Sequence, residues 1–134
     1  MKQLLLDTHA LVWWLYDHPK LSIRAHDLIA AAEDVYVSAA SIYEIDSKRR
    51  IPDRRRTLGG LSLMPPNMPE VLPLLGLRLL DISCDVAWRA ANLSIDHGDP
   101  WDRILIAQAA LLDIPLVSAD RVLIAQAGDT PVIW

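Results

Sequence analysis

Short apolar runs alternate along the chain with longer segments of helical periodicity. Four runs are typical of buried strands and a fifth candidate ends the chain, at residues 3–6, 35–37, 79–81, 116–118 and 131–134. The segments between them are expected to be helical, at residues 8–16, 22–33, 38–50, 69–76, 83–94, 100–113 and 121–127. Residues 51–68, with prolines and paired glycines, are expected to form an irregular connection.

Buried strands that alternate with helices indicate parallel strands joined by crossover helices. We therefore expect an α/β fold, a three-layer α/β/α sandwich around a central, mainly parallel sheet of four or five strands. The chain has 134 residues, of which 52% are hydrophobic, so it can bury a sizeable core. Its sequence contains no repeat or linker that indicates a second unit, and we expect a single domain, 1–134.

Charge and cysteine content narrow the classes of function. A net charge of −4 argues against a protein that coats nucleic acid, but it allows an enzyme that meets nucleic acid locally, or a basic protein partner. The single cysteine, Cys84, excludes an intramolecular disulfide and is expected to be a small buried side chain. No apolar run approaches the roughly 20 residues that span a bilayer, and the N-terminal run is too short for a signal peptide, so we expect a cytoplasmic protein.

Four carboxylates that are far apart in the sequence fall where a parallel sheet binds its ligands, beyond the carboxyl ends of the strands. Asp7 directly follows the first strand, and Asp120 lies two residues after Ser118, at the end of a later strand. Glu44 lies on the helix that leaves the second strand, and Asp102 lies in the first turn of its helix. We expect these four acids to line one cleft.

Four carboxylates in one cleft repel each other, by about 4 kcal/mol for a pair 4 Å apart at an effective dielectric near 20. Such a cluster therefore predicts a bound divalent cation. Oxygen ligands favour Mg²⁺ or Mn²⁺ over Zn²⁺. Either ion suits phosphodiester hydrolysis, because it activates a water molecule and neutralises charge on the scissile phosphate.

Each acid also has a structural interpretation. Asp102 could belong to a capping box, Asp120 could be a plain N-cap, and Glu44 could be an ordinary solvated helix residue. Asp7 is the hardest to explain in this way, since an acid directly after a buried strand is costly unless something pairs with it. Thr8 is a candidate N-cap for the helix that follows.

Four segments carry a resemblance that covers nearly the whole chain. They are residues 4–15 (LLLDTHALVWWL), 37–45 (VSAASIYEI), 99–109 (DPWDRILIAQA) and 116–120 (LVSAD). In this order and at these intervals they resemble the PIN-domain nucleases, and within them the VapC-type toxins of bacterial toxin–antitoxin pairs. The departures are Tyr43, where tryptophan is frequent, and the stretch 51–68.

The resemblance implies a Mg²⁺- or Mn²⁺-dependent endoribonuclease that cleaves RNA with a metal-activated water and is neutralised by a cognate antitoxin. Asp7, Glu44 and Asp102 match the core metal-binding acids of the family, and Asp120 matches a more variable fourth acid. VapC-like proteins usually form homodimers, and their antitoxin lays a segment near the site, often with a basic side chain that reaches the acids. The negative net charge fits such a partner.

Other side chains are expected to support the site. Asp99 is expected to be the N-cap of its helix, with a supporting role beside the metal ligands as the alternative. Thr8 and Ser118 could contact ligands or metal-bound water, although both also suit ordinary capping. His9 and His97 lie near the expected cleft in sequence, but a metal mechanism requires no catalytic histidine.

Arginines and tryptophans are the candidate RNA contacts. Arg54, Arg55 and Arg56 could bind phosphates without reading bases, or could form a solvated loop. Arg103 could contact phosphate or simply pair with an acid. Tryptophans suggest base stacking, but positions in helices and at strand ends favour packing in the core or at an interface for all five, Trp13, Trp14, Trp88, Trp101 and Trp134.

Two other functions use similar chemistry. Receiver domains and haloacid-dehalogenase-like phosphatases also gather acids at strand ends, but Asp7-Thr8-His9 supplies neither an acidic pair nor Asp-x-Asp, and no lysine follows Val117-Ser118. A catalytically inactive binding module of the same fold is the second alternative, and the intact set of four acids counts against it.

Overall fold

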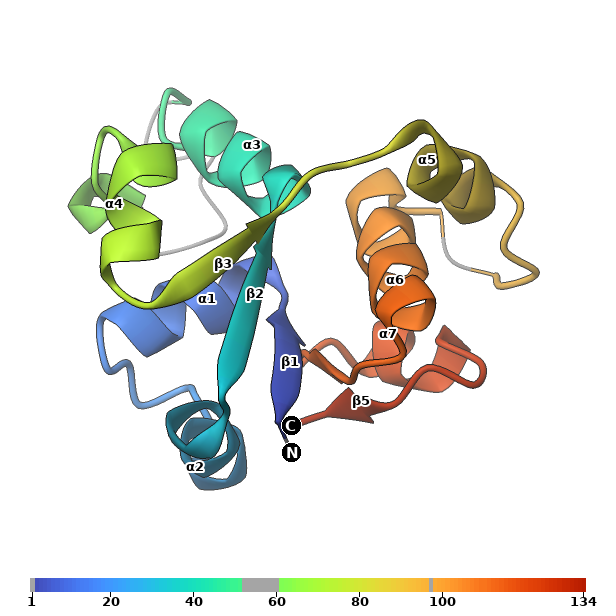
Figure 1. Cartoon of the computed structure of the whole chain (residues 1–134), viewed down its shortest axis with the longest axis horizontal. Coiled ribbons are helices and arrows are strands. Elements are labelled where there is room, and N and C mark those ends of the chain that lie inside the picture. The colour runs from blue at the N-terminus through green and yellow to red at the C-terminus, as the bar shows by residue number, and fades with distance from the viewer. Residues whose placement is uncertain (1, 52–60, 97) are drawn as a thin grey trace.

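The computed structural model describes residues 2–51, 61–96 and 98–134. Its strands are β1 (Gln3–Leu6), β2 (Asp34–Ser38), β3 (Leu77–Leu80), β4 (Leu116–Val117) and β5 (Val132–Ile133). Within the described residues these five strands form one sheet in the order β3-β2-β1-β4-β5, and every neighbouring pair is parallel (Figure 1). The expected α/β fold with a parallel sheet is confirmed.

Helices cover both faces of the sheet. Packed into the core on one face are α1 (Thr8–Leu15), α2 (Ile23–Ala31), α3 (Ala39–Lys48) and α4 (Met68–Leu74), with a 3₁₀ turn at Leu61–Leu63. On the other side lie α5 (Cys84–Ala91), α6 (Pro100–Leu112) and α7 (Arg121–Gln126). The result is the expected three-layer sandwich (Figure 1).

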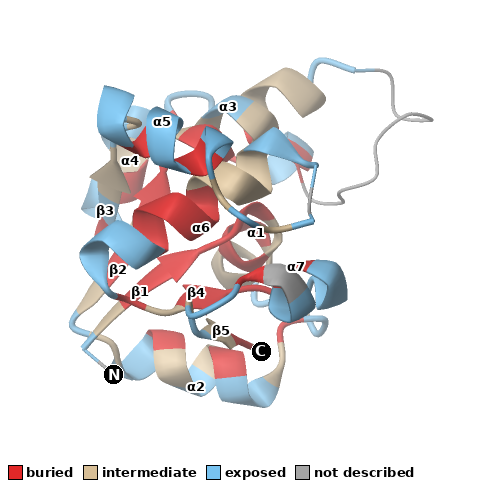
Figure 2. Cartoon of the chain, turned by 90° about the vertical axis from the view of Figure 1, so that its right-hand side faces the viewer, coloured by how far each residue is buried: buried red, intermediate tan, exposed pale blue. Residues whose placement is uncertain are grey.

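The alternation of side chains along the strands divides the core into two halves. Leu4 and Leu6 of β1 belong to the half beneath α1 to α4, whereas Leu5 belongs to the half beneath α6 and α7. All three are fully buried. Figure 2 shows buried residues concentrated in the sheet and in α6, where the run from Leu105 to Ala109 is buried. Burial on both faces explains why the strands are continuous apolar runs.

The strand order places a topological switch point between β1 and β4. From β1 the chain builds outward to β2 and β3, and it then returns to the opposite side of β1 with β4 and β5. In open parallel sheets a crevice forms at this point, outside the carboxyl ends of the strands. The Asp7 N–H donates to the Val117 carbonyl at 3.0 Å, so the residue after β1 lies directly at the end of β4.

Several local predictions need correction. Asp7, not Thr8, is the N-cap of α1. The third strand begins at Leu77 instead of residue 79, and α5 is shorter than the expected helix 83–94, since Asn92 is its C-cap. Cys84 is exposed, because α5 turns its Val86 side toward α6. No described helix is both long enough and apolar enough to span a bilayer.

Candidate active site

Asp7 lies at the switch point as the N-cap of α1. Its Oδ1 accepts a hydrogen bond from the Ala10 N–H at 2.8 Å, and only 6% of the residue is exposed. Extended backbone at the end of β1 and the start of a helix one residue later therefore fix the direction of this carboxylate. The helix N-terminus also favours its negative charge.

Burial raises the pKa of Asp7 to about 7, because removal from water disfavours the charged carboxylate. Hydrogen bonds from Ser118 and from the Ala10 N–H act in the opposite direction. The negative charges of Asp102 and Asp120 raise the pKa further. Asp102 and Asp120 are therefore both close enough to Asp7 to repel its charge.

Asp120 is the N-cap of α7 and reaches the same place from the end of β4. Its Oδ1 accepts hydrogen bonds from the N–H groups of Val122 at 2.9 Å and Leu123 at 3.2 Å. The Ser118 hydroxyl accepts from the Asp120 N–H at 3.1 Å and also hydrogen-bonds Asp7. Ser118 therefore connects two of the acids through hydrogen bonds.

Asp102 occupies the first turn of α6, directly after the cap of that helix. Asp99 is the N-cap, as predicted, and its Oδ1 accepts from the Trp101 N–H at 2.9 Å and the Asp102 N–H at 3.1 Å. Pro100 occupies the first helical position, where its missing N–H costs nothing. The positive end of the α6 dipole thus lies beneath Asp102.

Glu44 projects from α3, and a lysine that the sequence analysis did not single out holds it. The Lys48 Nζ donates to Glu44 Oε2 at 2.7 Å. The pair is partly buried, with 15% of the Glu44 side chain and 32% of the Lys48 side chain exposed. The spacing of four residues along a helix was the available signal, because it puts both side chains on one face.

These side chains line one cleft with a volume of about 350 Å³. All four predicted acids border it, and α1, α3, α6 and the segment after β4 each contribute lining residues, which are Asp7, Thr8, His9, Trp13, Glu44, Lys48, Asp99, Asp102, Ala119 and Asp120. Thr8 is buried, and its hydroxyl donates to the Ser41 hydroxyl at 3.0 Å, which ties α1 to α3 at the base of the cleft. The acid residues thus converge from segments that are far apart in the sequence.

The cleft has the donor set that a hard divalent cation requires. Its acidic oxygens suit Mg²⁺ or Mn²⁺, and the raised pKa of the buried Asp7 marks a place where added positive charge is favourable. In the part of the chain that the structure describes, no three His, Cys, Asp or Glu side chains already stand in a ligating arrangement. Glu44, paired with Lys48, would have to turn toward the others.

His9 and Trp13 form one wall of the cleft. Their rings meet edge to face with centroids 5.3 Å apart, and Trp13 also contacts His18 at 5.9 Å and Trp134 at 5.6 Å. Burial lowers the pKa of His9 below its usual value, and this effect outweighs the opposing charge of Glu44. His9 therefore favours the neutral form, and Trp13 packs against other rings instead of standing free.

Other tryptophans also follow the packing interpretation, with one exception. Trp101 lies against Tyr43 with ring centroids 5.1 Å apart, and Trp14 lies against His26 at 5.2 Å. Trp88 is instead 72% exposed on α5.

Arg103 follows Asp102 in sequence but points toward the end of α5. Its guanidinium donates to the carbonyls of Ala90 at 2.9 Å, Leu93 at 2.9 Å, Ile95 at 3.2 Å and Ala91 at 3.3 Å. These bonds satisfy carbonyls at a helix C-terminus that have no partner within the helix. These contacts to backbone carbonyls give Arg103 a structural role.

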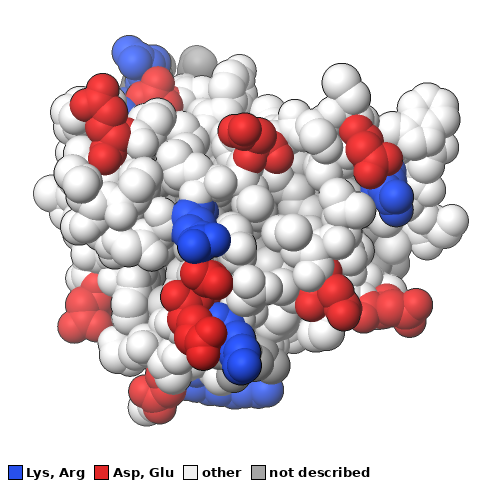
Figure 3. All heavy atoms as spheres, viewed as in Figure 1, with Lys and Arg blue, Asp and Glu red and all other residues white. Residues whose placement is uncertain are grey.

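The other predicted RNA contacts, Arg54, Arg55 and Arg56, lie outside the described residues, as does His97. On the face of the molecule seen in Figure 3, acidic and basic side chains are interspersed, and the described residues form no broad basic surface there. This distribution agrees with local, rather than bulk, attraction of a nucleic acid.

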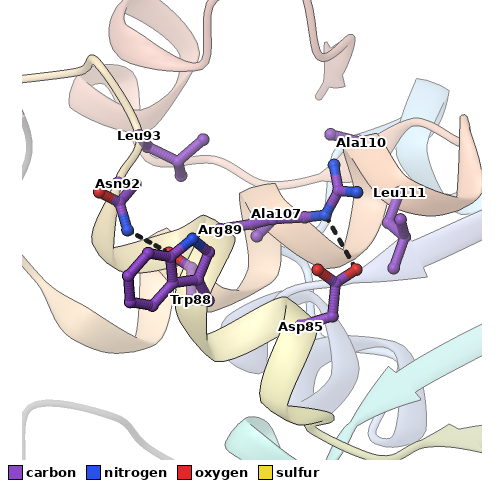
Figure 4. Close-up of a pocket in the computed structure, with 8 residues that line it drawn as sticks. All are labelled: Asp85, Trp88, Arg89, Asn92, Leu93, Ala107, Ala110 and Leu111. Carbon is purple, nitrogen blue, oxygen red and sulfur yellow. Dashed lines mark hydrogen bonds and ion pairs between the residues drawn. The ribbon is translucent and has the colours of Figure 1, made fainter.

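A larger hollow, of about 770 Å³, lies between α5 and α6, away from the acids (Figure 4). Trp88, Leu93 and Leu111 line it, together with an ion pair in which Arg89 Nε lies 2.9 Å from Asp85 Oδ2. Its single carboxylate is already paired and solvated. The smaller acid cleft is therefore the better candidate for a site that binds a divalent cation.

Comparisons with known proteins agree with this geometry. The PIN domain family model matches residues 4–129. Ribonuclease VapC22 of Mycobacterium tuberculosis is 30% identical over 139 aligned positions that span all of both chains.

Among solved structures, FitAcB from Neisseria gonorrhoeae superposes with a TM-score of 0.69 at 21% identity, over 98% of this chain and 96% of that one. A toxin–antitoxin complex from Klebsiella pneumoniae superposes with a TM-score of 0.65 at 20% identity, over 97% of this chain and 95% of that one. At these identities the two structures establish the fold alone. The family model and the full-length relative go further, and the chain belongs to the PIN-domain family and, within it, to the VapC-type ribonucleases.

Proposed function

We propose that this chain is the endoribonuclease toxin of a toxin–antitoxin pair and that it uses Mg²⁺, with Mn²⁺ as the alternative ion. Asp7, Glu44, Asp102 and Asp120 are the proposed ligands. The observation that carries the proposal is their convergence on one cleft at the switch point of a parallel sheet. The relative VapC22 is itself a ribonuclease, which supports RNA as the substrate.

The protein's contribution is to hold oxygens in fixed directions around the cleft. The Ala10 N–H and Ser118 bond the carboxylate of Asp7, and the cap of α6 fixes the turn that carries Asp102. A bound divalent cation supplies Lewis acidity, which activates a water molecule and neutralises charge on the scissile phosphate. We assign Thr8, Asp99 and Ser118 to orienting the ligands and their solvent.

Further parts of the proposal concern protein partners, location and RNA contacts. The Klebsiella relative is a toxin–antitoxin complex, so we propose a cognate antitoxin for this chain. Five acids line the cleft among the described residues, and a basic antitoxin side chain inserted there would block it. We also propose a homodimer, a cytoplasmic location, and phosphate contacts by Arg54, Arg55 and Arg56.

The decisive experiment is RNA cleavage by the protein purified free of any partner. We expect cleavage with Mg²⁺ or Mn²⁺, loss of cleavage with EDTA, and loss in Asp7→Ala. Asp85→Ala is the matched control, since Asp85 is an exposed acid on α5 outside the cleft. The proposal fails if the wild-type protein does not cleave, or if cleavage survives both EDTA and the Asp7 substitution.

Expression in cells separates a toxin from a housekeeping nuclease. We expect growth arrest that Asp7→Ala abolishes and that co-expression of a small neighbouring gene relieves. Cleavage in vitro without growth arrest would support a nuclease and contradict the toxin assignment.

A further inference from the structure

Lys48 is the one lysine or arginine among the described residues that line the acid cleft. Its Nζ lies 2.7 Å from Glu44 Oε2, and the rest of the lining includes Asp7, Asp102 and Asp120. A single positive charge thus stands among five acids, where the proposed metal would also bind. Its position needs an explanation beyond helix stability.

The Glu44–Lys48 pair differs from ordinary ion pairs on this protein. The same spacing of four residues joins Asp46 to Arg50 on the neighbouring face of α3, but there the arginine side chain is 73% exposed. In the cleft, only 15% of the Glu44 side chain and 32% of the Lys48 side chain are exposed. Partial burial strengthens electrostatic interactions, whereas a solvated pair contributes little.

Lys48 occupies Oε2 of Glu44, and a metal ion at this carboxylate would place a second cation beside the ammonium. Two cations on one carboxylate repel each other, whichever oxygen the metal takes, and partial burial strengthens that repulsion. Metal binding at Glu44 therefore weakens the pair and favours release of the ammonium. The released group remains inside the cleft, where it can pair with the phosphate of a bound RNA.

Resting on the proposed nuclease function, we propose that Lys48 is an exchangeable counter-ion of the active site. It holds Glu44 before the metal binds, and it transfers to the RNA phosphate when Glu44 turns to the metal. Lys48 therefore opposes metal binding and favours substrate binding. These opposite effects distinguish it from a residue that only stabilises α3.

The first test measures metal binding without RNA. Lys48→Met keeps most of the side-chain length and removes the charge, and Arg50→Met is the matched control on the same helix. We expect calorimetric titration with Mn²⁺ to show three- to tenfold tighter binding in Lys48→Met and no change in Arg50→Met. Unchanged or weaker binding in a Lys48→Met protein with a native circular dichroism spectrum would overturn the proposal.

The second test measures substrate binding at saturating Mn²⁺. We expect Lys48→Met to raise KM for RNA about tenfold, to leave kcat within about threefold, and to reduce the dependence of affinity on salt by about one phosphate contact. Lys48→Arg retains the charge and should restore most of the affinity. A lysine with a merely structural role would lower thermal stability without changing the salt dependence.

The two experiments separate this inference from the proposed function. If the wild-type protein does not cleave RNA, the nuclease assignment fails, yet the Mn²⁺ titration still decides whether Lys48 competes with a cation. If the wild-type protein cleaves and Lys48→Met behaves like Arg50→Met in both tests, the inference about Lys48 fails by itself.

Discussion

Asp7 shows how an acid proposed to bind a metal can cost stability in the metal-free fold. Its pKa lies near 7 instead of the ordinary 3.8, because the folded protein disfavours the charged carboxylate. A raised pKa means that folding is favoured by protonation. The stabilisation is complete below pH 4 and is lost as the pH rises through 7. At neutral pH and above, the buried charge costs the metal-free fold up to about 4 kcal/mol.

We therefore predict that Asp7→Asn stabilises the metal-free protein while it abolishes cleavage. Asparagine keeps the oxygen that caps α1 and removes the charge. Urea unfolding in EDTA should show an increase of roughly 2–4 kcal/mol at pH 8, and the advantage should shrink as the pH approaches 4. Asp7→Ala, which loses the cap, should gain less. An advantage that is equal at pH 4 and pH 8 would contradict the explanation.

Substitution of Asp120 should have a weaker effect on activity than substitution of Asp7. Asp120 is the N-cap of α7, and the family resemblance matches it to a more variable fourth acid. We predict that Asp120→Asn folds normally, since asparagine caps as well as aspartate. The Mg²⁺ concentration for half-maximal cleavage should rise by roughly tenfold, which corresponds to about 1.4 kcal/mol. Activity at saturating Mg²⁺ should persist. Complete loss at all Mg²⁺ concentrations would show that Asp120 is indispensable.

Residues at strand ends could be predicted from sequence, whereas those whose role depends on tertiary neighbours could not. Asp7 directly follows one buried apolar run, and Asp120 lies two residues after another. The structure places both at the switch point. The role of Arg103 could not be predicted, because nothing in the local sequence indicates that the end of α5 lies against its side chain. Cys84 was expected to be buried, but burial on a short helix depends on which face meets the next layer.

At the scale of elements, the anchor between α5 and α6 makes a testable contribution to stability. Arg103 bonds carbonyls in the last turn of α5 and in the segment that follows it. We predict that Arg103→Met lowers the free energy of unfolding by about 2–4 kcal/mol, since hydrogen bonds to charged groups contribute strongly and their loss leaves carbonyls unpaired. The rate of amide hydrogen exchange should increase most in α5.

Arg89→Met is the control for this prediction. Arg89 forms an exposed pair with Asp85 on α5, and its loss should change stability by about 0.5 kcal/mol or less. RNA affinity should be the same in both variants once they are folded. Weaker RNA binding in Arg103→Met, with unchanged stability, would instead support a phosphate contact.

Helix starts were easier to predict than strand limits. The helices expected to begin at residues 22, 38 and 100 begin within one residue of those positions, at Ile23, Ala39 and Pro100. Their N-caps are Ser22, Ser38 and Asp99, whose side-chain acceptors satisfy free N–H groups locally. The apolar pattern predicts a strand from residue 79, whereas β3 begins at Leu77. Leu77 pairs with Val35 of β2, and this pairing between strands, absent from the local pattern, decides where β3 begins.

At the scale of the whole molecule, the strand order creates the site. Periodicity predicts parallel strands, but it does not specify that β1 lies between β2 and β4. That order brings the ends of β1 and β4 together, and α3 and α6 then supply Glu44 and Asp102 from either side. The acid set and its shared cleft could be predicted from the sequence, whereas the strand order and the lysine in the cleft required the assembled fold.

Metal binding, folding and pH should be coupled through this cleft. A metal requires Asp7 as a carboxylate, and below pH 7 that group carries a proton in the metal-free fold. Each ion should therefore displace about one proton at pH 6 and almost none above pH 8. We predict that Mg²⁺ affinity rises about tenfold from pH 6 to pH 8 and then levels off. The thermal stabilisation by a fixed Mg²⁺ concentration should follow the same curve. Calorimetry in two buffers of different ionisation enthalpy measures the released proton directly, and an affinity that is constant over this range would show that Asp7 is already ionised without the metal.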